Sequence, residues 1–227
     1  FFANGSVNYS RSKNPYLISR SFHDLFVLTQ YVAAPDIPSG NSLSLSADVN
    51  KGIAFLRGKI GLAVQVMTDK SYLLRQASPM EFMHTNSSSY TLSPYVNGKL
   101  LNWCNMVYKL DYSTFSMQMS DFDKHDTHSI TQTMELIFSP WDKLNFSLLG
   151  EHYYTEFSDN QSKNLVLADF KAEYNLNEKW QLLLTATNIL NHDTYNYTLV
   201  DSANFTHSFT SYNIRPRNIL LGVFYKF

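Results

Sequence analysis

Apolar and polar residues alternate with a period of two along most of the chain. In the clearest run, Leu43, Leu45, Ala47 and Val49 are interleaved with Ser, Asp and Asn. Successive side chains of a β-strand point to opposite faces, so this pattern predicts a strand with one apolar and one polar face. The same alternation returns in further segments, whose apolar positions lie within Ile60–Val66, Met106–Tyr112, Ile130–Phe138, Val166–Tyr174 and Ile219–Phe227.

The pattern predicts an all-β fold of about eleven antiparallel strands. Several of them have ten or more residues, whereas strands of globular proteins usually have about five or six. Crossing a bilayer at a tilt takes about nine to eleven residues. The strand lengths therefore favour a transmembrane up-and-down β-barrel. The expected strands span residues 1–12, 20–33, 41–51, 57–68, 88–99, 102–119, 128–139, 144–157, 164–175, 180–191 and 216–227.

The expected connections alternate in length. Outer-membrane barrels have short periplasmic turns and longer extracellular loops, so this alternation supports the same fold. The link at 13–19 departs from it, because it is of intermediate length where a short turn is expected. The short links lie at 51–56, 100–101, 140–143 and 176–179, and the mostly longer ones at 34–40, 69–87, 120–127, 158–163 and 192–215.

Composition agrees with a barrel more than with a helical membrane protein. Aromatic residues make up 15% of the chain and charged residues 16%, yet the mean hydropathy is −0.24. No apolar run reaches the length of about 18 residues that a transmembrane helix needs. Trp103, Trp141 and Trp180 lie beside the short turns, as in an aromatic girdle at a membrane surface, although an aromatic-rich soluble β-core is an alternative. The net charge of −1 gives no electrostatic support for a nucleic-acid partner.

One stretch contains the residue types of a metal site. Asp121, Asp123, His125, Asp126 and His128 offer carboxylates and imidazoles, which together can bind a divalent ion. The spacing lacks the glycine and the ligand positions of a calcium loop. The alternative interpretation is a solvated loop, and we expect no metal ion and no cofactor.

Acid–base chemistry has a second set of candidates. Glu151, His152, Asp169 and Glu173 are expected on neighbouring strands. No Ser/His/Asp arrangement accompanies them, and charged side chains lining a barrel lumen explain them as well. We therefore expect that the chain is not an enzyme. The Tyr- and Asn-rich loop 192–215 is an open case, because its residues suit either ligand capture or packing on neighbouring loops; they include His192, Tyr195, Tyr197, Asn204, His207 and Tyr212.

The C-terminal segment carries a family resemblance. The run Thr187–Asn191, a Tyr-rich loop and the run Ile214–Phe227 together resemble the end of TonB-dependent outer-membrane receptors, most of all the Bacteroidetes type. In that family an Asn-(Leu/Ile)-(Phe/Leu)-Asn element closes the penultimate strand, and an Arg-Pro-Arg element opens the last one. The corresponding residues here are Asn188, Asn191, Arg215, Pro216 and Arg217, with Leu190 where Phe is commoner.

The resemblance implies active uptake of a nutrient through a barrel of about 22 strands that an N-terminal plug closes. Its implied partners are outer-membrane lipid, the plug and the rest of the barrel, TonB acting through the plug, and a surface lipoprotein. Neither a plug nor a TonB-contacting segment is visible in this sequence. The terminal aromatics Tyr225 and Phe227 resemble the signal that directs assembly of outer-membrane barrels, which implies an outer-membrane location.

Strand counting leads to a further expectation. If Phe227 ends on the periplasmic side, eleven alternating strands place Phe1 on the extracellular side. Single-chain barrels have an even number of strands with both ends periplasmic. Residues 1–227 are then expected to be the C-terminal half of a 22-stranded barrel domain. Two alternatives remain: a self-contained small barrel that serves as a pore, adhesin or enzyme, and a soluble carbohydrate-binding β-sandwich.

Overall fold

The computed structural model describes residues 1–13, 16–23, 26–33, 37–75, 81–120, 124–157, 161–201 and 206–227. Within these residues no helix is long and apolar enough to cross a membrane. The strands are β1 (Phe2–Ser12), β2 (Tyr16–His23), β3 (Phe26–Ala33), β4 (Gly40–Ile53), β5 (Gly58–Arg75), β6 (Glu81–Leu101), β7 (Cys104–Met119), β8 (His125–Trp141), β9 (Leu144–Phe157), β10 (Gln161–Asn175), β11 (Trp180–Thr187), β12 (Thr194–Asp201), β13 (Thr206–Asn213) and β14 (Asn218–Tyr225).

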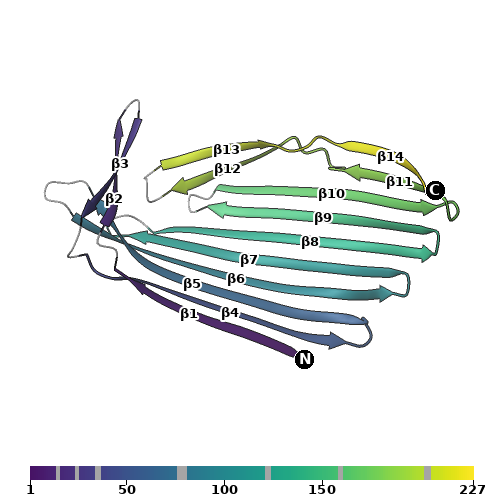
Figure 1. The fold of residues 1–227 in the computed structure, drawn as a ribbon, viewed down its shortest axis with the longest axis horizontal. Coiled ribbons are helices and arrows are strands. Elements are labelled where there is room, and N and C mark those ends of the chain that lie inside the picture. The colour runs from purple at the N-terminus through teal and green to yellow at the C-terminus, as the bar shows by residue number, and fades with distance from the viewer. Residues whose placement is uncertain are drawn as a thin grey trace.

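Ten strands form one antiparallel up-and-down sheet in the order β1-β4-β5-β6-β7-β8-β9-β10-β11-β14 (Figure 1). The other four form two separate hairpins, β2–β3 and β12–β13, which interrupt the order at its two ends. β1 and β14 are the edges of the sheet, and they neither pair with nor contact each other. The all-β antiparallel prediction is confirmed.

The prediction of a single wall strand over 20–33 is wrong. The chain reverses between His23 and Phe26, and β2 and β3 pair with each other, while β1 pairs directly with β4. A hairpin strand alternates with the same period of two as a wall strand, so the pattern alone does not distinguish them. The whole segment between Ser12 and Gly40 is thus one long connection, and the irregular link at 13–19 belongs to it.

The position of the N-terminus must also be corrected. With ten strands instead of eleven, β1 starts at the end of the sheet where β14 finishes, and both chain ends lie beside the short turns (Figure 1). Phe1 is therefore not on the opposite side from Phe227. Once the two hairpins are counted as parts of long links, the predicted alternation of link lengths holds except at the β9–β10 link, which has three residues and is shorter than the four-residue turns β4–β5 and β10–β11.

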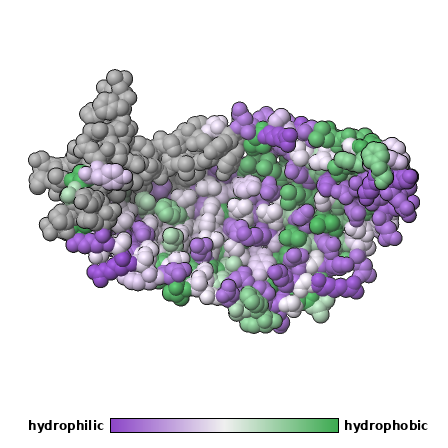
Figure 2. Space-filling view, in the orientation of Figure 1, coloured by the Kyte–Doolittle hydropathy of each residue, from purple (hydrophilic) through white to green (hydrophobic). Residues whose placement is uncertain are grey.

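The sheet has no hydrophobic core of its own. The buried apolar residues of the described part are only Ile37, Met83, Cys104, Met119 and Leu165, and no large side chain is fully buried. Hydrophobic side chains instead reach the surface, for example near the C-terminal strands in Figure 2. A soluble sandwich buries one face of each sheet against another sheet. The described residues contain no second sheet that covers this one.

Candidate membrane-facing surface and lumen wall

The strand register separates apolar and polar residues onto two faces over most of the sheet, although on β14 the second face carries the apolar residues Leu220, Gly222 and Phe224. Directly paired residues of antiparallel strands lie on the same face. Leu45 pairs with Val7 and Val66, whereas the adjacent Ser46 pairs with Ser6 and Gln65. We call the two sides the apolar face and the polar face.

The apolar residues form a band that crosses the strands at a slant. A row of paired residues perpendicular to the strands is apolar at one edge of the sheet and polar at the other. One such row begins with Val7, Leu45 and Val66 and ends with His128, Glu156 and Ser162. A second row begins with Lys51 and ends with Met134, Gly150 and Ala168.

The slant of this band has the size expected for a barrel wall. On β1 the band covers Ala3–Tyr9, and on β14 it covers Ile219–Tyr225, which lies further toward the short turns. The displacement is about ten residues, or about 33 Å, across nine strand spacings of about 4.8 Å, a slope of about 37°. Strands of outer-membrane barrels tilt by about 35–45°. A band that runs parallel to the membrane plane, on a wall whose strands are tilted, crosses the strands at this angle.

The height of the band also matches a bilayer. On β9 the outermost apolar positions of this face are Leu144 and Tyr154. Ten residues at about 3.3 Å each span about 33 Å along the strand. Because the strand is inclined by about 37°, this length corresponds to a band height of about 26 Å. The apolar band of outer-membrane barrels is about 25 Å tall.

Aromatic side chains mark the margin of the band beside the short turns. Trp103 stacks on Phe138 with ring centroids 6.0 Å apart, and Phe138 stacks on Phe146 at 4.6 Å. Trp180 packs on Tyr225 at 4.8 Å. These contacts join the aromatic side chains into two groups, one around Phe138 and one at Trp180 and Tyr225, and Trp141 lies at the same margin opposite Leu144.

Tyrosines mark the opposite margin, and the sequence already places two of them, Tyr112 and Tyr154, at strand ends. They occupy or adjoin the outermost apolar positions of four strands: Tyr9, Tyr90, Tyr112 and Tyr154. Their positions shift from strand to strand with the slant of the band. Rings with a polar tip favour a membrane–water interface, so a band with aromatic rows at both margins is typical of a membrane-facing surface.

The polar face carries a layer of hydroxyl groups and ion pairs. Ser6 and Ser46 hydroxyls lie 2.8 Å apart, and those of Ser113 and Ser129 2.6 Å apart. Lys109 pairs with Asp111 at 2.8 Å, and Lys171 with Glu173. Such a face suits contact with water or with another polar surface.

The Asn188 side chain links the end of β11 to the start of β14 through hydrogen bonds. Its amide nitrogen donates to the carbonyl oxygens of His192 (2.8 Å) and Arg215 (2.9 Å), and its amide oxygen accepts from the backbone N–H of His192 (3.1 Å). The Asn188 backbone N–H donates to the Asp169 carboxylate. Asn188 is only 6% exposed and has φ of 49°, a left-handed conformation that Asn tolerates better than most residues.

Other residues of the resemblance lie around this point. Asn191 also has a positive φ, 59°, and its side-chain oxygen accepts a long hydrogen bond from the Arg217 N–H at 3.4 Å. Pro216, between the two arginines, removes a backbone donor just before β14 begins. At the other end of β14, Tyr225 contacts Phe227 edge to face at 5.2 Å.

The structure separates the candidate metal ligands that it describes; Asp121 and Asp123 lie outside the described residues. His125 pairs with Met117 on the polar face, whereas Asp126 and His128 lie on the other face opposite Ser116 and Thr114. The Asp126 carboxylate accepts a hydrogen bond from Lys124 at 2.9 Å. This bond, with a second from Ser116, lowers the pKa of Asp126, which lies outside the apolar band. No cluster of three or more potential ligands occurs in the part of the chain that the structure describes.

The acid–base candidates are likewise divided. Glu151, Asp169 and Glu173 lie on the polar face, but His152 pairs with Gln132 and Val166 on the apolar face. The His152 ring is hydrogen-bonded to Asn164 at 2.8 Å. The structure therefore does not bring this imidazole together with the carboxylates.

The Tyr-rich loop 192–215 contains a hairpin. β12 and β13 pair so that Tyr195 lies opposite Tyr212 and Val200 opposite His207. Asn204 lies outside the described residues. The hairpin lies at the end of the sheet away from the chain termini (Figure 1), on the same side as the other long connections.

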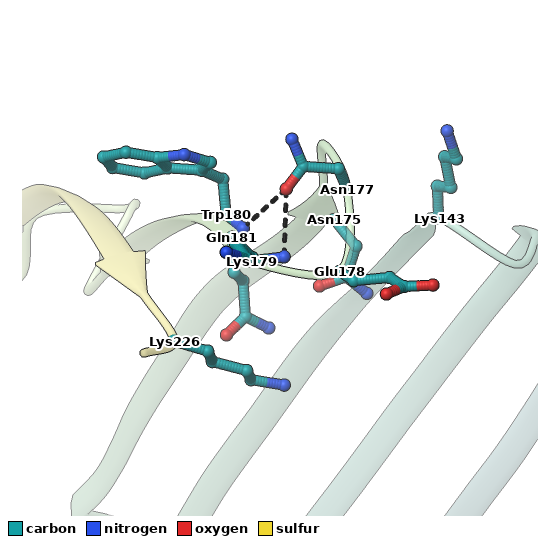
Figure 3. A pocket seen from close by; sticks show the side chains of 8 residues that line it. All are labelled: Lys143, Asn175, Asn177, Glu178, Lys179, Trp180, Gln181 and Lys226. Carbon is teal, nitrogen blue, oxygen red and sulfur yellow. Dashed lines mark hydrogen bonds between the residues drawn. The ribbon is translucent and has the colours of Figure 1, made fainter.

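A basic hollow of about 520 Å³ lies at the short-turn end of the C-terminal strands (Figure 3). Asn177 shapes the turn beside it, because its side-chain oxygen accepts hydrogen bonds from the backbone N–H groups of Lys179 and Trp180. The Trp180 side chain points away from Gln181 and Lys226 (Figure 3), as adjacent strand positions do. The hollow is lined by three lysines, one carboxylate, three amides and one tryptophan: Lys143, Asn175, Asn177, Glu178, Lys179, Trp180, Gln181 and Lys226.

No protein-family model, no curated protein and no solved structure matches this chain.

Proposed function

We propose that this chain forms part of the wall of an outer-membrane β-barrel that takes up a nutrient by active transport, in the manner of TonB-dependent receptors. The observation that carries the membrane assignment is the slanted apolar band with aromatic rows along both margins. Its height and slope fit a bilayer crossed by tilted strands. The opposite, hydroxyl-rich face then faces the lumen.

Two features support a place in a larger barrel. The edges β1 and β14 leave a row of backbone N–H and C=O groups without strand partners. In hydrocarbon each unsatisfied group costs several kcal/mol, so both edges need neighbouring strands. The transport assignment itself derives from the C-terminal resemblance, in which Asn188 and Arg215 are hydrogen-bonded to each other.

Adjacent leucines of β9 provide a matched test of the membrane orientation. Leu148 lies on the apolar face near the middle of the band, and Leu149 lies on the polar face opposite Glu135 and Asp169. We expect Leu148→Arg in the natural gene product to destabilise the membrane-inserted fold by about 2–4 kcal/mol. Leu149→Arg adds the same charge beside two carboxylates and is expected to change stability by less than about 1 kcal/mol.

Urea unfolding in lipid vesicles, together with the amount of protein in the outer-membrane fraction, measures both variants. Equal tolerance of the two arginines, or a wild-type protein that stays in aqueous solution without detergent, refutes the membrane assignment.

Active transport has its own test. Deletion of the gene is expected to impair growth on a particular nutrient, found by comparing mutant and wild-type cells over a panel of carbon, metal and vitamin sources. Loss of TonB function is expected to cause the same defect, and combining the two losses is expected to add nothing. A growth defect that is unaffected by loss of TonB refutes active transport while leaving the barrel assignment intact.

A self-contained ten-stranded pore is the second candidate, and the strand count favours it. Single-chain barrels have an even number of strands, and the described sheet has ten. In that case β1 pairs with β14. Cysteine pairs joining Ser6 with Leu220, Gly222 or Phe224 test this, because a disulfide requires Cα atoms about 4.4–6.8 Å apart. Efficient crosslinking within one chain supports the small barrel, and its absence supports the larger wall.

A further inference from the structure

A row of cations and amides crosses the apolar side of the sheet outside the apolar band, one same-face position beyond Tyr9 on β1 and three beyond Tyr112 on β7. Arg11 pairs with Asn41, Asn41 with Lys70, Lys70 with Asn86, and Asn86 with Gln118. Lys124, just before β8, lines the same hollow as the last four. No carboxylate occupies this row, so its polar groups are three cations and three amides.

The centre of the row is hollowed. A space of about 340 Å³ lies between Lys70 and Lys124, with the hydroxyl-bearing residues Thr68, Ser88 and Ser116 among its lining. Ammonium, amide and hydroxyl groups are the donors that bind phosphate oxygens. The combination therefore suits a phosphate group.

The charges around the hollow leave a net positive site. Lys124 pairs with Asp126 at 2.9 Å, which neutralises part of its charge. Asp69 also lines the hollow, but its register places it on the polar face opposite Ser42 and Ser87. Lys70 has no ion pair with any described carboxylate. Lys70 is thus the cation available to an added anion.

The apolar band begins one row away from the cation row on β1 and β4, two rows away on β5 and β6, and three rows away on β7. Tyr9 and Leu43 occupy the next row, and Leu45, Val66 and Tyr90 the row after it. A molecule with a phosphate at the hollow can therefore lay an apolar tail along the band. Free phosphate makes only the exposed polar contacts at the hollow. A phospholipid or phosphorylated glycolipid makes these contacts and also apolar contacts along the band.

The geometry points to a binding site for the phosphate of an anionic membrane lipid, with Lys70 and Lys124 as its principal cations. This inference rests on the membrane orientation proposed above. The site lies on the long-connection side, so its ligand belongs to the outer leaflet, and the acyl chains of that lipid cover Leu43, Leu45 and Val66.

The test uses the natural gene product, purified in detergent and examined by native mass spectrometry. Three probes are added: lipid A bisphosphate, dephosphorylated lipid A and inorganic phosphate. The test variant is Lys70→Gln/Lys124→Gln. The control variant is Lys51→Gln/Lys163→Gln, because Lys51 lies on the same face toward the other margin and Lys163 lies at the same end on the polar face.

The test variant is expected to bind lipid A bisphosphate about 30-fold more weakly, since each lysine near an anionic headgroup contributes about a factor of five. The control variant is expected to bind like the wild type, and dephosphorylated lipid A to bind wild type weakly. Equal lipid binding by test and control variants overturns the inference. Binding of inorganic phosphate as tight as that of the lipid overturns it as well, because the ligand is then the free ion. A protein absent from the membrane fraction refutes both proposals, whereas an integral membrane protein with unaltered lipid binding refutes this one alone.

Discussion

The side-chain amide of Asn188 donates a hydrogen bond to the carbonyl oxygen of Arg215, 27 residues further along the chain. These two residues enclose the whole β12–β13 hairpin, so the bond closes the long connection at its base. Two sequence elements that resemble a family signature thereby acquire a physical role, which is to hold β14 in register beside β11.

Asn188→Ala is expected to destabilise the fold by about 2–4 kcal/mol, because it removes three hydrogen bonds at a buried position and leaves a non-glycine residue at positive φ. Urea unfolding in vesicles measures the loss. Asn188→Gly separates the two causes, since glycine accepts this φ but has no amide. If the glycine variant is as stable as wild type, backbone strain and not hydrogen bonding explains the alanine result.

Two glycines of the wall, Gly61 on β5 and Gly150 on β9, are predicted to respond differently to alanine. The Tyr95 ring lies against Gly61, so that a Cβ at residue 61 overlaps it, and the Tyr95 hydroxyl lies 3.4 Å from the Asp48 carboxylate. Gly61→Ala is expected to displace the ring and cost about 1–3 kcal/mol. A Cβ at Gly150 meets only the Met134 carbonyl oxygen at 3.9 Å, so Gly150→Ala is expected to be neutral or slightly stabilising. Unfolding midpoints compare the two, and an equal loss contradicts the close packing of Tyr95.

The sequence predicted the faces of the wall better than the ends of its strands. Alternation defined residues 57–68 as one strand and 88–99 as the next, yet β5 continues to Arg75 and β6 begins at Glu81. Both errors lie at the long-connection end. Beyond the apolar band, polar and apolar residues no longer alternate along the strands. The backbone pairing between the strands nevertheless continues. The alternating pattern therefore predicts the part of each strand that lies in the apolar band better than it predicts the full length of the hydrogen-bonded strand.

The two hairpins were missed for a different reason. The reversal between His23 and Phe26 contains no Gly, Pro or Asn, and the single turn-forming residue Asp24 is too weak a signal to divide 20–33. The sequence likewise predicted some of the site residues and not others. Asn188 was found through its sequence element, whereas the row from Arg11 to Lys124 emerged only from the register, because its members are far apart in the chain.

Titration of Asp126 tests the ion pair beside the phosphate site. The hydrogen bond from Lys124 holds the pKa of Asp126 below its usual value, so Lys124→Gln is expected to raise that pKa toward the usual value of an aspartate. A lowered folded-state pKa stabilises the fold above the unfolded-state pKa, and this stabilisation is lost as the pH falls through the folded-state value. NMR titration of the carboxyl carbon in micelles measures the shift. An unchanged pKa in Lys124→Gln, with Lys163→Gln as the control, contradicts the pairing.

The three tryptophans are predicted to lie at a single shallow depth. Trp103, Trp141 and Trp180 all border the short-turn margin of the band, so their rings belong at one membrane–water interface. In vesicles, lipids brominated near the glycerol are expected to quench their fluorescence more strongly than lipids brominated near the chain ends. Subtracting the signal of a variant with all three replaced by Phe isolates their contribution from that of any other tryptophan in the gene product. Stronger quenching by the deep bromines would place these side chains in the bilayer centre, and no quenching by either would place them in water; each result contradicts an interfacial aromatic row.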